Sequence, residues 1–150
     1  MLTNKFKINY SIGAVANGIK TDTFTFFLLF FYSNIIGLNP ALAGSAIFIA
    51  LCVDAVTDPL MGTISDRTNS SYGRRHPFMM ISFIPMSLGY IFLFAPRQDW
   101  DMSQSDLFIW MTIFTVITRI GMTLFDIPHR AFGGEITKNY KERTILMSWR

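Results

Sequence analysis

Two aspartates, Asp54 and Asp58, lie four residues apart in an otherwise apolar stretch of the sequence. If the stretch is a helix, both carboxylates project from one face, about 6 Å apart. Two like charges that close must share a proton or a cation. Pro59 follows directly and has no N–H to donate to the carbonyl of Ala55, so that oxygen is also free to bind an ion. The spacing predicts a cation site.

Four more ionisable residues, Lys20, Asp22, Arg119 and Asp126, interrupt apolar sequence elsewhere in the chain. A charge at bilayer depth costs roughly 3 kcal/mol or more, so such residues usually serve a function. The alternative is structural pairing, in which the acids and the two cations only hold helices together. Lys20 or Arg119 would then neutralise the paired aspartates, or serve as the counter-charge of Asp22 or Asp126.

Four apolar segments are long enough to carry these residues across a bilayer, since a spanning helix needs about 20 mostly apolar residues. Hydrophobic residues make up 51% of the 150-residue chain and charged residues 15%, a composition that excludes a disordered chain. The sequence therefore predicts an all-α integral membrane protein. We expect helices near residues 10–36, 41–65, 77–96 and 106–129, and the start of a fifth near Ile145.

Basic residues are divided unequally between the two sides of this predicted membrane protein. Arg97 is alone on one side, whereas nine basic residues fall on the other, which places the N-terminus in the cytoplasm of a multi-pass protein in the cell (inner or plasma) membrane. The nine are Lys5, Lys7, Arg67, Arg74, Arg75, Arg130, Lys138, Lys141 and Arg143. The net charge of +3 is therefore interpreted as a topology signal and not as a nucleic-acid site. Asp54 precedes the loop residue Asp66 by 12 residues, or about 18 Å of helix rise, which places it near mid-membrane.

Enzymatic chemistry finds no support in the sequence. No nucleophile with a base and no phosphate-binding loop is present, so we expect neither an enzyme nor a cofactor. Cys52 is the lone cysteine and cannot form a disulfide within the chain. His76 and His129 have no cysteine or carboxylate at ligand spacing, so no metal site is expected other than a Na+ at the paired aspartates.

Two blocks of sequence resemble the glycoside-pentoside-hexuronide:cation symporter family. The stretch from Asp54 to Phe78 is similar to the family's second helix and following loop, and the stretch from Asp126 to Arg150 to its fourth helix, cytoplasmic loop and start of the fifth. The resemblance implies the major facilitator fold, with twelve helices in two six-helix bundles. Residues 1–150 are then expected to be a fragment that forms part of the N-terminal bundle.

The resemblance also implies roles for single residues. Asp54 and Asp58 match the coupling-cation carboxylates, with Thr123 near them from the fourth helix. Asp126 and Arg150 match residues of the sugar site, where a carboxylate can accept two hydroxyl hydrogen bonds. The loop between the second and third helices is expected to gate and orient the protein, because an acid and arginines at helix ends can form a cluster that holds one conformation and breaks in the other. Its residues are Gly62, Asp66, Arg67, Gly73, Arg74 and Arg75.

The chain departs from the family pattern at two places. The helix-one acid of the family's melibiose permease aligns with Gly18, beside Asn17, and Asp22 lies one turn further on. The arginine usual before the first helix-two acid is replaced by Leu51. The substrate-binding set expected here is therefore Asp126, Arg150, Lys20, Asp22, Arg119 and Asn17, and its two buried cations would suit an anionic sugar such as a hexuronide.

These features predict a secondary active transporter that couples symport of a sugar, glycoside or hexuronide to Na+ or H+ by alternating access. Its partners would be the small-molecule substrate and the lipid bilayer, and the full-length protein would be monomeric. Two alternatives remain open. One is an uncoupled sugar facilitator of the same fold, and the other is a small four-helix membrane exporter or interaction subunit.

Overall fold

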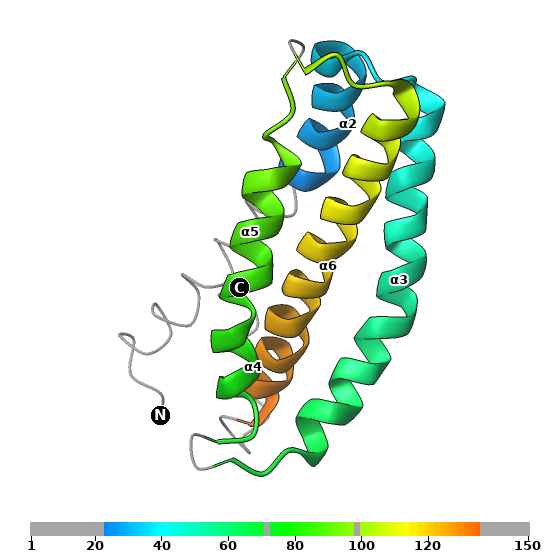
Figure 1. The fold of residues 1–150 in the computed structure, drawn as a ribbon. Helices are drawn as coiled ribbons and strands as arrows, with labels where there is room; N and C mark the ends of the chain where they lie inside the picture. Colours follow the sequence, from blue (N-terminus) through cyan, green and yellow to red (C-terminus); the bar gives the residue numbers. More distant parts are fainter. Residues whose placement is uncertain (1–22, 71–72, 98–99, 136–150) are drawn as a thin grey trace.

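The computed structural model describes residues 23–70, 73–97 and 100–135, and every regular element among them is a helix. The two long helices α3 (Pro40–Arg67) and α6 (Gln104–Glu135) lie side by side, and α4 (His76–Ile81) and α5 (Phe83–Leu93) follow one another along the other flank of α6 (Figure 1). Three helical stretches, Pro40–Arg67, His76–Leu93 and Gln104–Ala131, are long and apolar enough to cross a membrane. The expected all-helical membrane architecture is confirmed.

The first described helix is short and irregular. Wide, π-type turns over Thr23–Phe27 and Phe31–Ile36 flank a single α-helical turn, α2 (Leu28–Phe30). Gly37 ends this helix in the left-handed region, at φ 88°, which glycine adopts without the steric cost of a side chain. Residues 10–22 of the expected segment 10–36 lie outside the described part of the chain.

The helix α3 has clear signals at its start. Asn39 caps it by accepting a hydrogen bond from the amide of Ala41 at 2.9 Å, and Pro40 occupies a first-turn position where its missing N–H is harmless. Gln104, at the start of α6, accepts from the Asn39 amide and donates to the Gly37 carbonyl, both at 2.8 Å. These hydrogen bonds therefore connect the end of the first helix with the starts of α3 and α6 at one end of the bundle.

The helices differ from the sequence expectation in one boundary and contain one interruption. The interruption falls at Ser82, between α4 and α5, because Pro85 has no N–H to donate to the carbonyl of Ile81 one turn before it. The expected end of the fourth segment at residue 129 is wrong, because α6 continues to Glu135 with Pro128 inside it. Polar residues such as Arg130 indicate where the bilayer ends, whereas the helical hydrogen bonds continue beyond it.

Buried side chains gather between the first helix, the N-terminal half of α3 and the adjoining ends of α5 and α6. Tyr32 is fully buried there and donates its hydroxyl hydrogen to the carbonyl of Leu93 at 2.7 Å. Trp110 donates its indole N–H to the neighbouring carbonyl of Phe92 at 2.9 Å. Two side chains thus donate to carbonyls in the last turn of α5, where a helix lacks its regular donors, and the Phe92 carbonyl also accepts from the Ala95 amide at 3.3 Å. The core consists of Phe24, Leu28, Tyr32, Leu38, Ala43, Ala46, Leu93, Leu107 and Met111.

The helices α5 and α6 approach each other closely at two glycines. A Cβ atom at Gly89 would lie 2.3 Å from the Thr118 hydroxyl oxygen, and one at Gly121 would lie 2.7 Å from the backbone nitrogen of Met86. Small residues at such crossings let helix backbones pack together in membranes. This close packing therefore fixes which face of α6 is turned toward α5.

Candidate functional site

A cavity of about 150 Å³ lies between α3 and α6, and four of the six ionisable residues that interrupt apolar sequence line it. Asp54 and Asp58 enter it from one face of α3, and Arg119 and Thr123 enter it from the facing side of α6. Each pair is four residues apart, so a single helical face presents both members. The lining consists of Phe24, Asp54, Asp58, Arg119, Met122, Thr123, Asp126 and Arg130.

Asp54 is paired with a cation from α6. The Nη1 group of Arg119 donates to Oδ2 of Asp54 in an ion pair whose side chains are only 18% and 20% exposed. The guanidinium also lies 5.2 Å from the ring centroid of Phe24, within range of a cation–π interaction. Within the described part of the chain, the second Asp54 oxygen, Oδ1, is buried without a hydrogen-bond partner.

Asp58 has a different kind of partner. The Thr123 hydroxyl donates to Oδ1 of Asp58 at 2.7 Å, and Thr123 is only 6% exposed. The hydroxyl oxygen keeps its lone pairs, so Thr123 and Asp58 together present oxygen atoms of the type that hard cations prefer. The described residues provide no cationic partner for Asp58. The expectation that the two carboxylates must share a proton or cation is thus modified, because each has its own partner on α6.

The contacts between α3 and α6 keep a constant sequence separation. Asn39 and Gln104, Asp54 and Arg119, and Asp58 and Thr123 are each 65 residues apart. The two helices therefore run parallel, and their corresponding turns face each other from the first turn to the cavity.

Asp126, the expected sugar-binding acid, lines the same cavity less than one turn after Thr123. Three lining residues were not predicted from the sequence: Phe24, Met122 and Arg130. A signal existed for Arg130, which is four residues after Asp126 and so shares its face of the helix. No local pattern could have indicated Phe24, because its contact with Arg119 joins two separate helices.

Four residues of the expected substrate set cannot be placed in this cavity. Asn17, Lys20, Asp22 and Arg150 lie outside the described residues, and their roles stay predictions.

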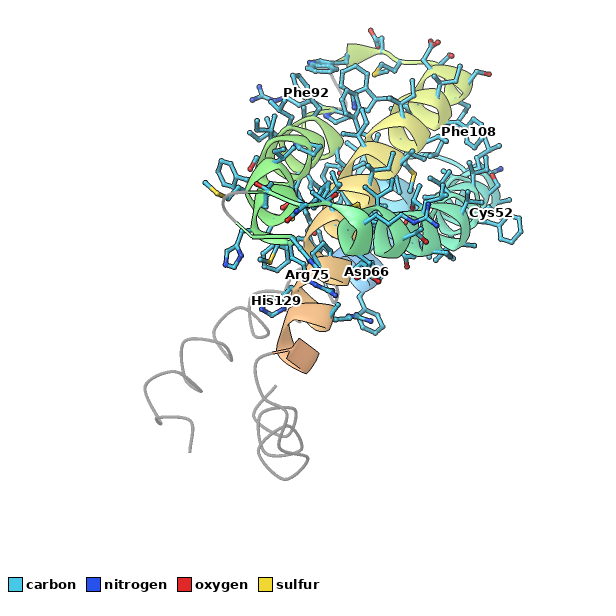
Figure 2. The ribbon with its side chains drawn as sticks, turned by 90° about the horizontal axis from the view of Figure 1, so that it is seen from below. Cys52, Asp66, Arg75, Phe92, Phe108 and His129 are labelled. Carbon is cyan, nitrogen blue, oxygen red and sulfur yellow. The ribbon has the colours of Figure 1, made fainter. Side chains whose placement is uncertain are left out.

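The expected gating loop forms a second charge cluster at one end of the bundle. Nη2 of Arg75 lies 2.8 Å from Oδ1 of Asp66, and the Arg75 side chain is buried whereas that of Asp66 is 63% exposed. Figure 2, seen from that end, shows the two side chains close together. Gly73 turns the chain between them at φ 91°, a backbone angle that favours glycine.

The other residues of the expected gating loop have less specific surroundings. Arg67 and Arg74 are exposed. Gly62 lies inside α3, where a Cβ would meet Ile127 of α6 at an ordinary 3.8 Å.

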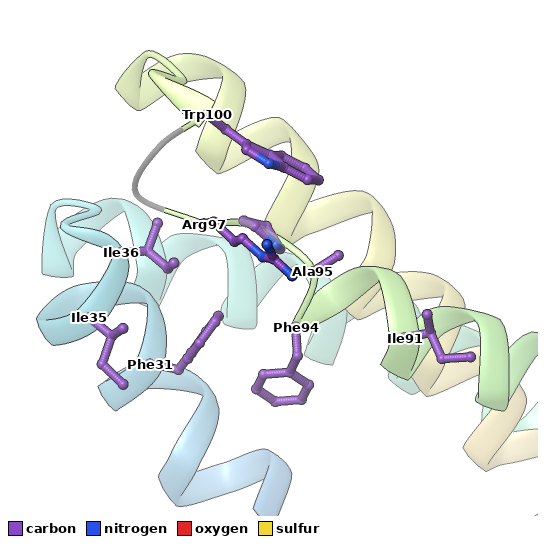
Figure 3. A pocket seen from close by; sticks show the side chains of 9 residues that line it. Phe31, Ile35, Ile36, Ile91, Phe94, Ala95, Arg97 and Trp100 are labelled. Atoms are coloured by element: carbon purple, nitrogen blue, oxygen red, sulfur yellow. The ribbon is translucent and has the colours of Figure 1, made fainter.

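A larger cavity of about 880 Å³ lies at the opposite end of the bundle (Figure 3). The lining residues that the structure describes are mostly apolar and aromatic, with Arg97 as the charged one, and include no carboxylate. Asp54, Asp58 and Asp126 line the smaller cavity between α3 and α6.

Comparison with known proteins finds one family along nearly the whole chain. A family model described as MFS/sugar transport protein matches residues 9–150. An uncharacterized symporter of Synechocystis sp. is 37% identical over 96% of this chain and 27% of its own length. A putative glycoside/cation symporter of Escherichia coli is 34% identical over 99% of this chain and 32% of its own length. An isoprimeverose transporter of Lactiplantibacillus pentosus is 24% identical over 96% of this chain and 29% of its own length. The chain spans about a third of the length of these curated relatives.

Proposed function

The chain belongs to the MFS/sugar transport protein family, as its resemblance to glycoside/cation symporters indicated, and we propose that it forms the N-terminal part of a cation-coupled symporter of a sugar, glycoside or hexuronide. The family and the names of the relatives are those of transporters, which agrees with the expectation that the chain is not an enzyme. The chain is a membrane protein, and we place its N-terminus and its Asp66–Arg75 cluster on the cytoplasmic side.

One observation carries this proposal: two membrane-spanning helices bring an acid–hydroxyl pair and a further acid to one cavity. Asp58 and Thr123 meet at 2.7 Å, and Asp126 lines the same space. The first two offer oxygen ligands for Na+ or a site for H+, and Asp126 can accept hydroxyl hydrogen bonds from a sugar. Because the cavity joins both sets of groups, binding of the cation changes the charge that the sugar meets.

The proposed cycle follows from the cost of buried charge. An empty site leaves the Asp58 carboxylate without a cation inside the membrane, which opposes closure of the protein around it. Bound cation and sugar together remove that cost and permit the two bundles of the whole protein to move about the site. The Asp66–Arg75 pair would hold one of the two conformations and break in the other.

Uptake by the whole transporter in proteoliposomes tests this function. We expect an inward Na+ or H+ gradient to stimulate uptake of a glycoside or uronide by the unchanged protein, and Asp58→Asn to abolish the stimulation. Asp101→Asn is the matched control, because Asp101 is an exposed loop residue and the same charge is removed. If Asp58→Asn takes up sugar at an unchanged rate without any gradient, the protein is a facilitator and the coupling assignment is wrong.

A further inference from the structure

We propose that Arg119 is a built-in counter-cation for Asp54, so that the coupling cation is balanced by the charge of Asp58 alone. This inference rests on the proposed symport function and assigns the charges of the two turns of the same cavity that carry Asp54 and Asp58. It changes the expectation that both carboxylates contribute their charge to the ion.

The cavity contains two successive contacts between the same helices. In one, the carboxylate of Asp54 meets the guanidinium of Arg119, and the charges cancel. In the other, the carboxylate of Asp58 meets the neutral hydroxyl of Thr123, and one negative charge remains. In both contacts the two partners are 65 residues apart in the sequence, so the contacts lie on consecutive turns of the same two helices.

The surroundings of the Asp54–Arg119 ion pair stabilise it. Both side chains are about four-fifths buried, and Phe24 of the first helix covers the guanidinium at 5.2 Å. Removal of one partner from a buried pair leaves the other charge without compensation, which is strongly unfavourable. A small inorganic cation would have to displace this held guanidinium before it could use the Asp54 charge.

Asp54 nevertheless keeps one oxygen for the ion. Its Oδ1 atom is buried and has no hydrogen-bond partner among the described residues, so it can act as a ligand while Oδ2 is held by Arg119. For that purpose Asp54 behaves as a neutral oxygen donor, comparable to the amide oxygen of asparagine. The geometry thus points to one monovalent cation per transport cycle.

A set of charge-matched variants of the whole transporter tests the assignment. Asp54→Asn alone leaves an unpaired guanidinium beside the cation site, and like-charge repulsion should raise the cation concentration for half-maximal uptake by at least about tenfold. Adding Arg119→Gln removes that guanidinium and keeps an amide oxygen at position 54. In the double variant we expect the cation concentration for half-maximal uptake to return to within about threefold of that of the unchanged protein, with one cation carried per sugar. The maximal rate of uptake is not part of this comparison, because Arg119 also belongs to the expected substrate-binding set.

The control is the double variant Asp58→Asn with Arg119→Gln, which has the same net charge but loses the carboxylate that Thr123 contacts. We expect no recovery in it. Size-exclusion profiles in detergent establish that each variant is folded before uptake is measured.

The outcomes separate this inference from the function on which it rests. If gradient-dependent uptake of the unchanged protein is seen but folded Asp54→Asn/Arg119→Gln stays as impaired as Asp54→Asn, the cation needs the Asp54 charge and the inference is wrong. Equal recovery in both double variants would also overturn it, because only total charge would matter. Gradient-independent uptake by the unchanged protein would overturn the proposed function first.

Discussion

The close contact between α5 and α6 at Gly121 leads to a quantitative prediction for Gly121→Ala. Gly121 lies between Arg119 and Thr123, so its packing fixes the helical face that carries the site. The new Cβ would lie 2.7 Å from the Met86 backbone nitrogen and 3.0 Å from its Cα, against the 3.4 Å at which ordinary contacts begin. Since the opposing atoms are backbone, the helices would have to separate by about 0.7 Å.

The expected magnitude is the difference between two effects. Extra methyl groups in a packed interior cost about 1–3 kcal/mol. Replacement of glycine by alanine inside a helix contributes about 0.5–1 kcal/mol in the opposite direction. We therefore expect Gly121→Ala to lower the free energy of unfolding by about 1 kcal/mol, and by at most about 2.5 kcal/mol.

Unfolding of the purified whole protein in mixed micelles containing increasing SDS measures this free energy. Gly62→Ala is the matched control, because its Cβ would face α6 at an ordinary 3.8 Å from Ile127. That variant should be as stable as the unchanged protein, or more so by the helix-propensity gain. If Gly121→Ala is stabilised to the same extent as Gly62→Ala, the close approach of α5 and α6 is refuted.

Two further predictions concern the ends of the bundle. Tyr32→Phe removes the buried hydroxyl that donates to the Leu93 carbonyl. It should lower the free energy of unfolding by about 1–2 kcal/mol in the same assay. An unchanged free energy would mean that the carbonyl finds another donor. The second prediction uses Arg74→Cys in a protein whose exposed Cys52 is replaced by serine. The new cysteine should react with a membrane-impermeant maleimide only from the cytoplasmic face. Labelling of intact cells from outside would reverse the proposed orientation.

The sequence predicted which residues share a helical face, because that depends only on local spacing. Asp54 and Asp58 were assigned to a common face in this way, and both line the cavity. Helix positions followed from apolar runs, since composition indicates what lies in the bilayer. The end of α6 did not follow, because a helix can extend into water without a change in its hydrogen bonds.

The partner of each acid could not be predicted from the sequence. Asp54 was left with Lys20 or Arg119 as alternatives, because the choice depends on how α3 and α6 are rotated and shifted relative to each other. That arrangement is set by tertiary contacts between the two helices, such as the hydrogen bond between Asn39 and Gln104, which involve no charged residue. The sequence could therefore supply the groups of the candidate site but not their pairing.

The constant separation of 65 residues between α3 and α6 makes the cavity sensitive to the length of α6 as well as to its composition. Each residue inserted into a helix rotates everything after it by about 100° and advances it by about 1.5 Å. One extra residue between Gln104 and Arg119 would leave the Gln104 clamp intact and turn both cavity partners away from α3. An insertion between Thr68 and Ser70, outside the helices, would leave the phase unchanged. Length variation in this part of the chain is therefore expected to be confined to the connecting segments.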